Sequence, residues 1–293
     1  MPIDFAIVRQ DRDFSCRADG ARAFPVGRKV SFRSGGITRV GLANDHLKPP
    51  PQAVYDPSAY RAQHGFWADF LAPTVSAESG GSFIALNTYD RAAFTFGFAQ
   101  FAAHTPDGDF VRWFRAMLER AEAQDYFPNL AVQGGRIHSM ELDDDVALES
   151  AQSTERLQAY LNEAATIVDD REVIAAAKLI HWTTHHAGAR DLQVLFAVDL
   201  ARRRVQRADQ RLRLDGRAAG ECFVIFDILH QGRGGSDTFP RLDALLRERD
   251  PLAALLTVGK DEYPSRIAKL RKAIDAEPQF ASLRWSSAAR SFA

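Results

Sequence analysis

The chain has 293 residues, of which 46% are hydrophobic and 26% are charged, and its formal net charge is -1. This balanced charge argues against a general nucleic-acid binder, which carries a large basic excess, and the hydrophobic content argues against wholesale disorder. The two cysteines, Cys16 and Cys222, lie far apart in the sequence, so neither a disulfide framework nor a cysteine-based zinc site is expected.

Residues 1–50 carry several proline and glycine residues and close on Lys48-Pro49-Pro50-Pro51, a run that favours an extended chain. We therefore expect an N-terminal arm of irregular structure and short strands over residues 1–55. The remainder, 56–293, is expected to form one helix-dominated α+β domain.

Asp56-Pro57 is typical of a helix start, because an N-cap residue precedes proline at the first helical position. Pro73 is expected to break or kink this helix, so that Glu78 stands on a short second helical segment. The following Ser79-Gly80-Gly81-Ser82 predicts a tight turn. The buried face of the helix is marked by apolar and aromatic residues three to four apart, namely Tyr60, His64, Trp67, Phe70 and Leu71.

Two runs rich in β-forming residues follow at 83–89 and 93–101, with a turn between them at 87–91. A helix is expected at 109–124 and a small hairpin at 130–140, around Gly134-Gly135. The rest of the chain is predicted to be mainly helical, over residues 154–167, 170–187, 190–207, 219–230, 238–247, 251–257 and 262–275.

Glu78 and Asp90 are candidate catalytic carboxylates, one at a helix end and one at the junction of the two β-runs. In an inverting glycosidase one carboxyl protonates the leaving oxygen and the other, roughly 6.5–9.5 Å away, activates a water. Thr95 could orient that water through its hydroxyl group. The alternatives are a helix-terminal surface glutamate, a turn-stabilising aspartate and an ordinary β-residue.

The segment from Asp90 to Phe101 resembles the block that follows the catalytic glutamate in the lysozyme-like superfamily. It is nearest the chitosanase branch, glycoside hydrolase family 46, in which an aspartate precedes an aromatic-Thr-x-Gly segment by the same interval. The resemblance implies that Glu78 is the general acid, Asp90 the general base and Thr95 the water-orienting residue. It also implies a lysozyme-like fold of two lobes. The implied reaction is hydrolysis of β-1,4 linkages with inversion of configuration and without a cofactor. Two polar residues in this region, Asn87 and Gln100, are further candidates for substrate contact.

Two more distant segments are similar to the same family. Phe226–Gly232 resembles a helix that carries an aromatic-Asp pair and ends near His-Gly, and the C-terminal region resembles an arginine-bearing helix with a Leu-x-Trp tail. In the family these parts form a charge network that supports the catalytic acid, so the resemblance implies that Asp227 pairs with Arg266 or Arg271. A plain surface salt bridge is the alternative.

The interval from Glu78 to Asp90 is shorter than in the chitosanases, and Phe-Gly-x-x-Gln-Phe is closer to peptidoglycan-cleaving relatives. The resemblance does not fix the substrate. Peptidoglycan is preferred and chitosan comes second, because a strongly cationic polymer favours a more acidic cleft and only a modest acid excess surrounds the motif. The competing hypotheses are a catalytically inactive glycan-binding protein and a docking protein for a secretion or phage assembly, the latter through the arginines of 202–217. The acidic residues interspersed there favour a solvated, salt-bridged helix.

No run approaches the roughly 20 apolar residues of a membrane span, and Met1–Phe5 lacks the features of a secretory signal. Because polymeric sugars lie outside the cytoplasm, we expect an extracellular or periplasmic site of action. Export would then use a removed leader, lysis or a signal-less route.

Three other patterns have ordinary interpretations. His181 and His185 have zinc-compatible spacing, but no third ligand is obvious, so no metal site is expected. The run 143–145, three aspartates, is interpreted as a solvated loop and not a calcium site. The segment 232–235 is interpreted as a helix C-cap and turn.

Overall fold

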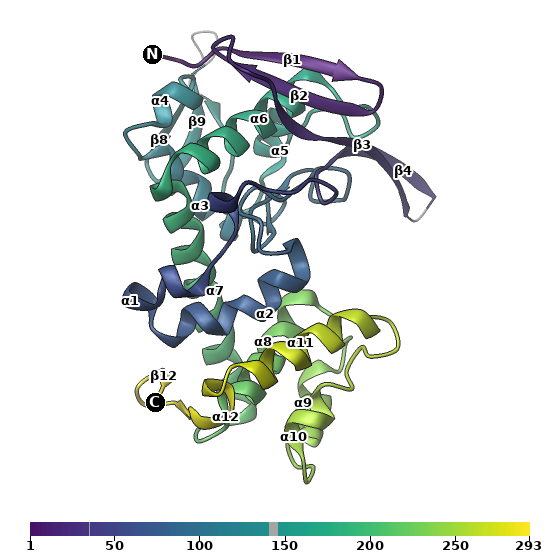
Figure 1. The fold of residues 1–293 in the computed structure, drawn as a ribbon, viewed down its shortest axis with the longest axis vertical. Coiled ribbons are helices and arrows are strands. Elements are labelled where there is room, and N and C mark those ends of the chain that lie inside the picture. The colour runs from purple at the N-terminus through teal and green to yellow at the C-terminus, as the bar shows by residue number, and fades with distance from the viewer. Residues whose placement is uncertain (35, 141–145) are drawn as a thin grey trace. The chain divides into compact units, whose positions relative to one another are not determined.

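The computed structural model describes residues 1–34, 36–140 and 146–293 and is α+β (Figure 1). Its contacts divide the chain into two compact units. Unit 1 comprises residues 1–55 and 79–196, and unit 2 comprises residues 56–78 and 197–293. Two boundaries fall inside helices, after Glu78 in α2 (Phe66–Ser79) and after Phe196 in α7 (Ala187–Leu212).

Unit 1 contains a seven-stranded antiparallel sheet whose strands pair in chain order. Its first four strands lie in the region for which the sequence predicts irregular structure and short strands. Alternate residues of β2, namely Phe14, Cys16 and Ala18, are buried, the two-residue period of a half-buried strand. These strands contact helix α6 (Asp170–His185), across which they lie in Figure 1. Their bounds are Phe5–Gln10 (β1), Asp13–Ala18 (β2), Phe24–Ser34 (β3) and Ile37–Ala43 (β4).

The two predicted β-runs at 83–101 form only two-residue strands. Ala43 of β4 pairs with Asn87, so these strands and the N-terminal ones belong to one sheet. The strands are short because tight turns interrupt them, with positive φ angles at Ala93, Gly97 and Gln100. Their bounds are Leu86–Asn87 (β5), Thr95–Phe96 (β6) and Phe101–Ala102 (β7).

The aromatic residues of this region form the core of unit 1. The rings of Phe96 and Trp113 stack with centroids 5.7 Å apart, and Phe110 packs against Trp113. Trp113 lies on α3 (Asp109–Leu118), and α4 (Ala123–Tyr126) follows, so the single helix predicted at 109–124 is divided.

The hairpin predicted at 130–140 is confirmed, with Gly134 and Gly135 at positive φ between its strands. The helix predicted at 154–167 is shorter, because Asn162 adopts an extended conformation at its end. The remaining elements of unit 1 are η1 (Pro51–Ala53), β8 (Leu130–Gln133), β9 (Arg136–Ser139), β10 (Val146–Ala147) and α5 (Glu155–Leu161).

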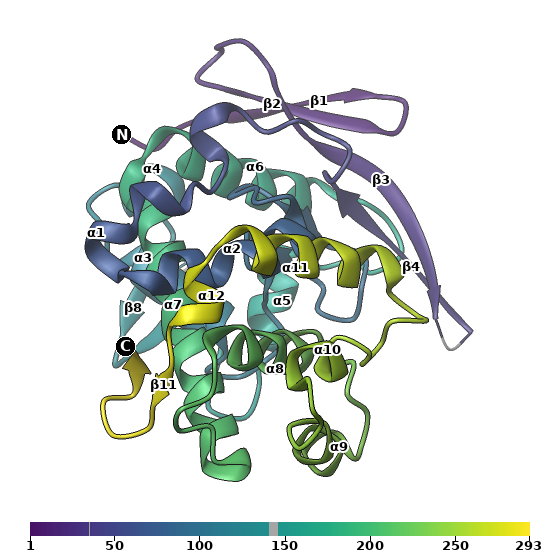
Figure 2. The same ribbon diagram turned by 60° about the horizontal axis from the view of Figure 1, so that its bottom comes forward.

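Unit 2 is mainly helical, and Figure 2 shows α12 beside α8, in agreement with their contacts. Its core is aromatic: Phe70 packs on Phe223 and Phe226, and Phe223 on Phe280. The predicted helices of this region are confirmed with modest shifts of their ends. Besides parts of α2 and α7, unit 2 contains η2 (Pro57–Ala59), α1 (Arg61–His64), α8 (Ala219–Gln231), α9 (Thr238–Leu245), α10 (Pro251–Leu255), α11 (Pro264–Ala276), α12 (Gln279–Ser282), β11 (Trp285–Ser286) and β12 (Ser291–Phe292).

The predicted break at Pro73 is wrong, because α2 runs from Phe66 to Ser79 with Pro73 inside it. Proline removes one backbone hydrogen bond, but Phe70, Leu71 and Val75 around it are buried. Packing of this face therefore holds the helix together, and Glu78 lies in its last turn. Asp56 caps only the single turn η2.

Candidate functional site

Glu78 ends the part of α2 that belongs to unit 2, and its side chain is 23% exposed. The predicted glycine turn follows, with φ of 63° at Gly80 and 77° at Gly81. These are left-handed conformations that glycine adopts without strain. The carboxyl group is thus carried by the end of a rigid helix and remains accessible.

Arg266 of α11 joins Glu78 to a buried aspartate. Its Nη1 atom lies 2.8 Å from Glu78 Oε1, and its Nη2 donates a hydrogen bond of 2.6 Å to Asp227 Oδ1. Thr74 of α2 donates to the same oxygen at 2.7 Å. Three helices of unit 2 therefore converge on one chain of charged groups.

Arg233 completes this network and was missed by the sequence analysis. It lies just after Gly232, the left-handed C-cap of α8, and donates to Asp227 Oδ2. The side chains of both Arg233 and Asp227 are fully buried. The only available signal was the position of Arg233, in a glycine-rich turn six residues after the helical Asp227. This position does not indicate that the arginine side chain is buried.

The pKa of Asp227 is lowered although burial alone would raise it. The hydrogen bond from Arg266 and the charges of Arg233 and Arg266 outweigh the cost of desolvation. Asp227 is therefore a buried, ionised aspartate, and its pairing with Arg266 is not the surface salt bridge of the alternative hypothesis. Arg271 takes no part, because it pairs with Asp275 on the exposed side of α11.

In unit 1, three of the predicted site residues meet on one hairpin. Asn87 of β5 lies opposite Thr95 of β6 and donates from Nδ2 to Asp90 Oδ2 at 3.1 Å. Asp90 Oδ1 accepts from the backbone N–H of Ala92 at 2.8 Å, the contact of an aspartate-stabilised turn. The turn interpretation of Asp90 is therefore present in the structure, and Thr95 is buried.

Gln100 and Gly97 shape the end of this hairpin. Gln100 has a positive φ and donates from its side chain to the carbonyl of Gly97 at 2.9 Å. Gln193 of α7, fully buried, accepts from the N–H of Phe98 and donates to the carbonyl of Phe83. Gln193 is a second residue that the sequence analysis missed, because its position in a predicted helix does not indicate that it bonds to Phe83 and Phe98 about 100 positions earlier.

Asp90 lines a cavity of about 220 Å³ within unit 1. Glu155 and Glu163 also contribute carboxyl groups to its lining, and Arg39 contributes one positive charge. Asn162 donates from Nδ2 to two carbonyl groups, while its buried Oδ1 has no hydrogen-bond partner among the residues that the structure describes. The cavity therefore offers polar acceptors to a small ligand or to water beside Asp90.

A buried carboxyl group, Glu172 of α6, lies directly behind this hairpin. Its Oε1 accepts from the hydroxyl of Thr88 and, at 3.0 Å, from the N–H of Leu42. Burial raises the pKa of Glu172 to about 8, although both hydrogen bonds act against the rise. At neutral pH this side chain is mainly protonated.

The histidines of α6 form a packed cluster. The rings of His181 and His185 stack 3.9 Å apart, and His181 Nδ1 lies 2.9 Å from the hydroxyl of Tyr126. Burial lowers the pKa of His181 to about 4. Within the described residues no group of three or more His, Cys, Asp or Glu side chains could hold a metal ion, and the aspartates at 143–145 lie outside those residues.

Across residues 1–34, 36–140 and 146–293, no helix has both the length and the apolar character needed to cross a membrane. Comparisons of the chain with models of protein families, with curated proteins and with solved structures found no match.

Proposed function

We propose that this protein is a glycoside hydrolase of lysozyme-like fold that cleaves β-1,4 linkages in an amino-sugar polysaccharide. Peptidoglycan is the preferred substrate and chitosan the second. One observation carries the proposal: Arg266 lies between Glu78 and the buried Asp227. This is the supporting network that the sequence resemblance implies around a catalytic acid.

The network holds the guanidinium group of Arg266 beside the proposed acid. Arg266 has hydrogen bonds to Asp227 in addition to its ion pair with Glu78, so this largely buried cation does not depend on Glu78 for a partner. Because Asp227 is also bound by Arg233 and Thr74, its position does not depend on the state of Glu78. The groups around the proposed general acid are therefore held in fixed positions.

In this proposal Asp90 activates the attacking water and Thr95 orients it. Asn87 and the N–H of Ala92 fix the direction of the Asp90 carboxyl group. The adjoining cavity gives that group access to small polar molecules. Inversion requires the acid and base to act from opposite faces of the sugar.

The same contacts of Asp90 favour a second candidate function, a glycan-binding protein without catalysis on this fold. An aspartate whose two oxygens stabilise a turn is already explained structurally. Saturable sugar binding that survives Glu78→Gln, in a parent with no hydrolytic activity, would select this function. A docking role would instead depend on Arg203 and Arg207, and charge reversal of both would abolish capture of the assembly partner.

The decisive experiment measures soluble products released from peptidoglycan and from chitosan by the wild type, Glu78→Gln and Asp90→Asn. Loss of a general acid or base lowers the rate by roughly 10²–10⁴-fold. Glu248→Gln in unit 2 and Asp191→Asn in unit 1 are matched controls, because both positions are exposed. Losses confined to Glu78→Gln and Asp90→Asn support the proposal, and equal activity of all variants contradicts it.

A further inference from the structure

The last part of strand β3 is an open edge of the sheet in unit 1. β2 pairs with residues 24–28 of β3, whereas β4 pairs with β3 as far as Ser34. The end of β3 therefore has one neighbouring strand instead of two, and Figures 1 and 2 show the hairpin of β3 and β4 running on past β2. Residues 31–33, which lie in this part of the strand, are all exposed.

Two hydrogen bonds show in which direction the backbone groups of this edge point. The N–H of Lys29 donates to the carbonyl of Arg12 at 2.7 Å, on the β2 side of the strand, and the N–H of Val40, opposite Ser31, donates away from β3. Because these groups alternate in direction along a strand, Ser31 and Arg33 also turn their N–H and C=O groups away from β4. Within the described part of the chain, these groups have no backbone partner.

One face of this edge is positively charged. Lys29 and Arg33 lie on either side of Ser31 and on the same face of β3, because alternate side chains of a strand point the same way. Both are exposed, and neither has an ion-pair partner within residues 1–34, 36–140 and 146–293, whereas the neighbouring Arg28 pairs with Asp13. A strand added at this edge therefore meets two uncompensated cations.

The other face of the edge is apolar at Phe32. This residue is 47% exposed, and its ring lies against that of Tyr89 with centroids 6.0 Å apart. An apolar side chain directly opposite Phe32 on an added strand would extend this contact. The two faces together favour a strand in which acidic and apolar residues alternate.

We propose that the end of β3 binds an extended acidic segment of another protein, which joins the sheet as an additional antiparallel strand. Two acidic residues of this segment lie opposite Ser31 and Arg33, exchange backbone hydrogen bonds with them and place their carboxylates beside Lys29 and Arg33. The apolar residue between them packs on Phe32. In such strand addition, backbone bonds give affinity and alternate side chains give specificity. The proposal does not depend on the proposed hydrolase activity.

A second copy of this chain is a poor occupant of the edge. Antiparallel pairing of two copies about Ser31 would set Lys29 of each copy opposite Arg33 of the other, and like charges on facing strands are destabilising. Cations on an exposed edge strand therefore oppose self-association, while the same charges attract a strand that carries carboxylates.

The test is an NMR titration of the ¹⁵N-labelled full chain with the peptide Glu-Val-Glu-Val-Glu, blocked at both ends. Saturable shifts should appear at the amide groups of Ser31 and Arg33. Lys-Val-Lys-Val-Lys has the opposite charge and Glu-Glu-Glu-Val-Val lacks the alternation, so both should bind at least about tenfold more weakly. Methylation of the glutamate nitrogens, which face β3, should weaken binding at least about tenfold, whereas methylation of the valine nitrogens, which face away, should have little effect.

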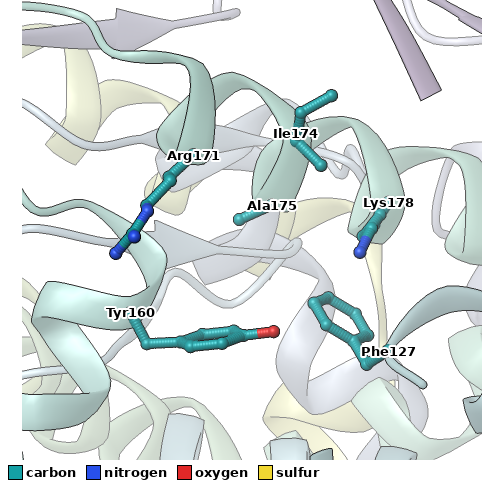
Figure 3. Close-up of a pocket in the computed structure, with 6 residues that line it drawn as sticks. All are labelled: Phe127, Tyr160, Arg171, Ile174, Ala175 and Lys178. Atoms are coloured by element: carbon teal, nitrogen blue, oxygen red, sulfur yellow. The ribbon is translucent and has the colours of Figure 1, made fainter. Parts of the chain in front are cut away.

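Variants separate strand addition from general attraction between charges. The double variant Lys29→Gln, Arg33→Gln removes both cations, and Ser31→Pro removes an outward N–H without removing a bond to β4, so each should weaken binding about tenfold. Arg171→Gln is the control and should leave binding unchanged, because this exposed arginine lies on α6 at a small pocket, where it pairs with Glu163 (Figure 3).

Several results would overturn the proposal: no saturable shift with the alternating peptide, equal binding of the two methylated peptides, or equal losses in all variants. Dimerisation of the chain alone that Ser31→Pro abolishes would also overturn it, because the edge would then bind a second copy. The comparison of peptides uses the wild type and is decisive if a variant fails to fold.

Discussion

At the scale of single residues, the most consequential group is Asp227. It is fully buried, yet it is ionised because Arg233, Arg266 and Thr74 all donate to it. A buried ion pair adds little net stability, but removal of one partner leaves the other charge without compensation. The network therefore makes each of its members hard to replace.

Asp227→Asn should lower the free energy of unfolding by about 3–5 kcal/mol, because buried Arg233 loses its counter-charge. Asp275→Asn makes the same substitution in the exposed pair with Arg271 and should change stability by less than about 1 kcal/mol. Urea unfolding followed by circular dichroism compares the two. Equal losses would show that the buried network is not a structural unit.

Glu172 should make the protein less stable as the pH rises. Its pKa is 4.5 in the unfolded chain and about 8 in the folded protein, so folding favours the protonated form. The contribution of Glu172 is complete below pH 4.5 and is lost progressively as the pH rises toward about 8, at about 1.4 kcal/mol per pH unit.

Glu172→Gln keeps a neutral side chain of the same shape and should flatten the pH dependence of unfolding between pH 4.5 and about 8. Chemical denaturation of both proteins at several pH values in this window measures the difference in slope. A parallel pair of curves would mean that Glu172 does not control stability in this range.

At the scale of elements, the hairpin of β5 and β6 shows how a backbone conformation is fixed by a partner far away in the sequence. Gly97 has a φ of 86°, and a β-carbon at this position would collide with Gln193 Oε1. Gln193 itself bonds Phe98 and Phe83. The hairpin can therefore pack this closely against Gln193 of α7 only because position 97 is a glycine.

Gly97→Ala should destabilise the protein by about 1–3 kcal/mol, through left-handed strain and displacement of Gln193. Gly134→Ala is the matched control, because Gly134 also has a positive φ, of 54°, but a β-carbon added there would meet no described atom within 4 Å. Thermal unfolding of both variants separates the clash from the strain. If Gly97→Ala were no worse than Gly134→Ala, the contact with Gln193 would be unimportant.

Some elements can be predicted from local sequence patterns alone. The helix at 219–230 and the hairpin around Gly134-Gly135 follow from periodicity and turn residues, and both are present. The continuity of α2 through Pro73 could not be predicted, because it depends on packing against residues such as Phe223 and Phe226 more than 140 positions away.

At the scale of the whole molecule, the α+β class was predictable from the sequence, but the grouping of its parts was not. Residues 1–55 were expected to form an arm of irregular structure and short strands, and the four strands between residues 5 and 43 belong to one sheet with the strands of 86–102. The strand β3 is eleven residues long, and its apolar residues Phe24, Val26, Val30 and Phe32 occupy alternate positions. Pro25, Gly27 and the charged Arg28 interrupt this pattern, so the sequence does not mark the strand clearly.

The candidate site was also predictable only in part, because some of its contacts depend on tertiary packing. The pairing of Asp227 with Arg266 was anticipated through a sequence resemblance. The burial of Arg233 was not, because Arg233 contacts Asp227 of α8 and the carbonyl group of Val258, 25 positions away. Glu78 belongs to unit 2 and Asp90 to unit 1. The proposal that they act together is therefore tested by an assay of the full protein.

The most direct measurement follows the hydrolysis of peptidoglycan and chitosan oligomers by ¹H NMR, which records both the rate and the anomeric configuration of the first product. For the wild type we expect release of the inverted α-anomer from at least one polymer, with a loss of roughly 10²–10⁴-fold in Glu78→Gln and full activity in Glu248→Gln. Retained activity in Glu78→Gln, or no product from either polymer with the wild type, would contradict the assignment of Glu78 as the general acid of a glycoside hydrolase.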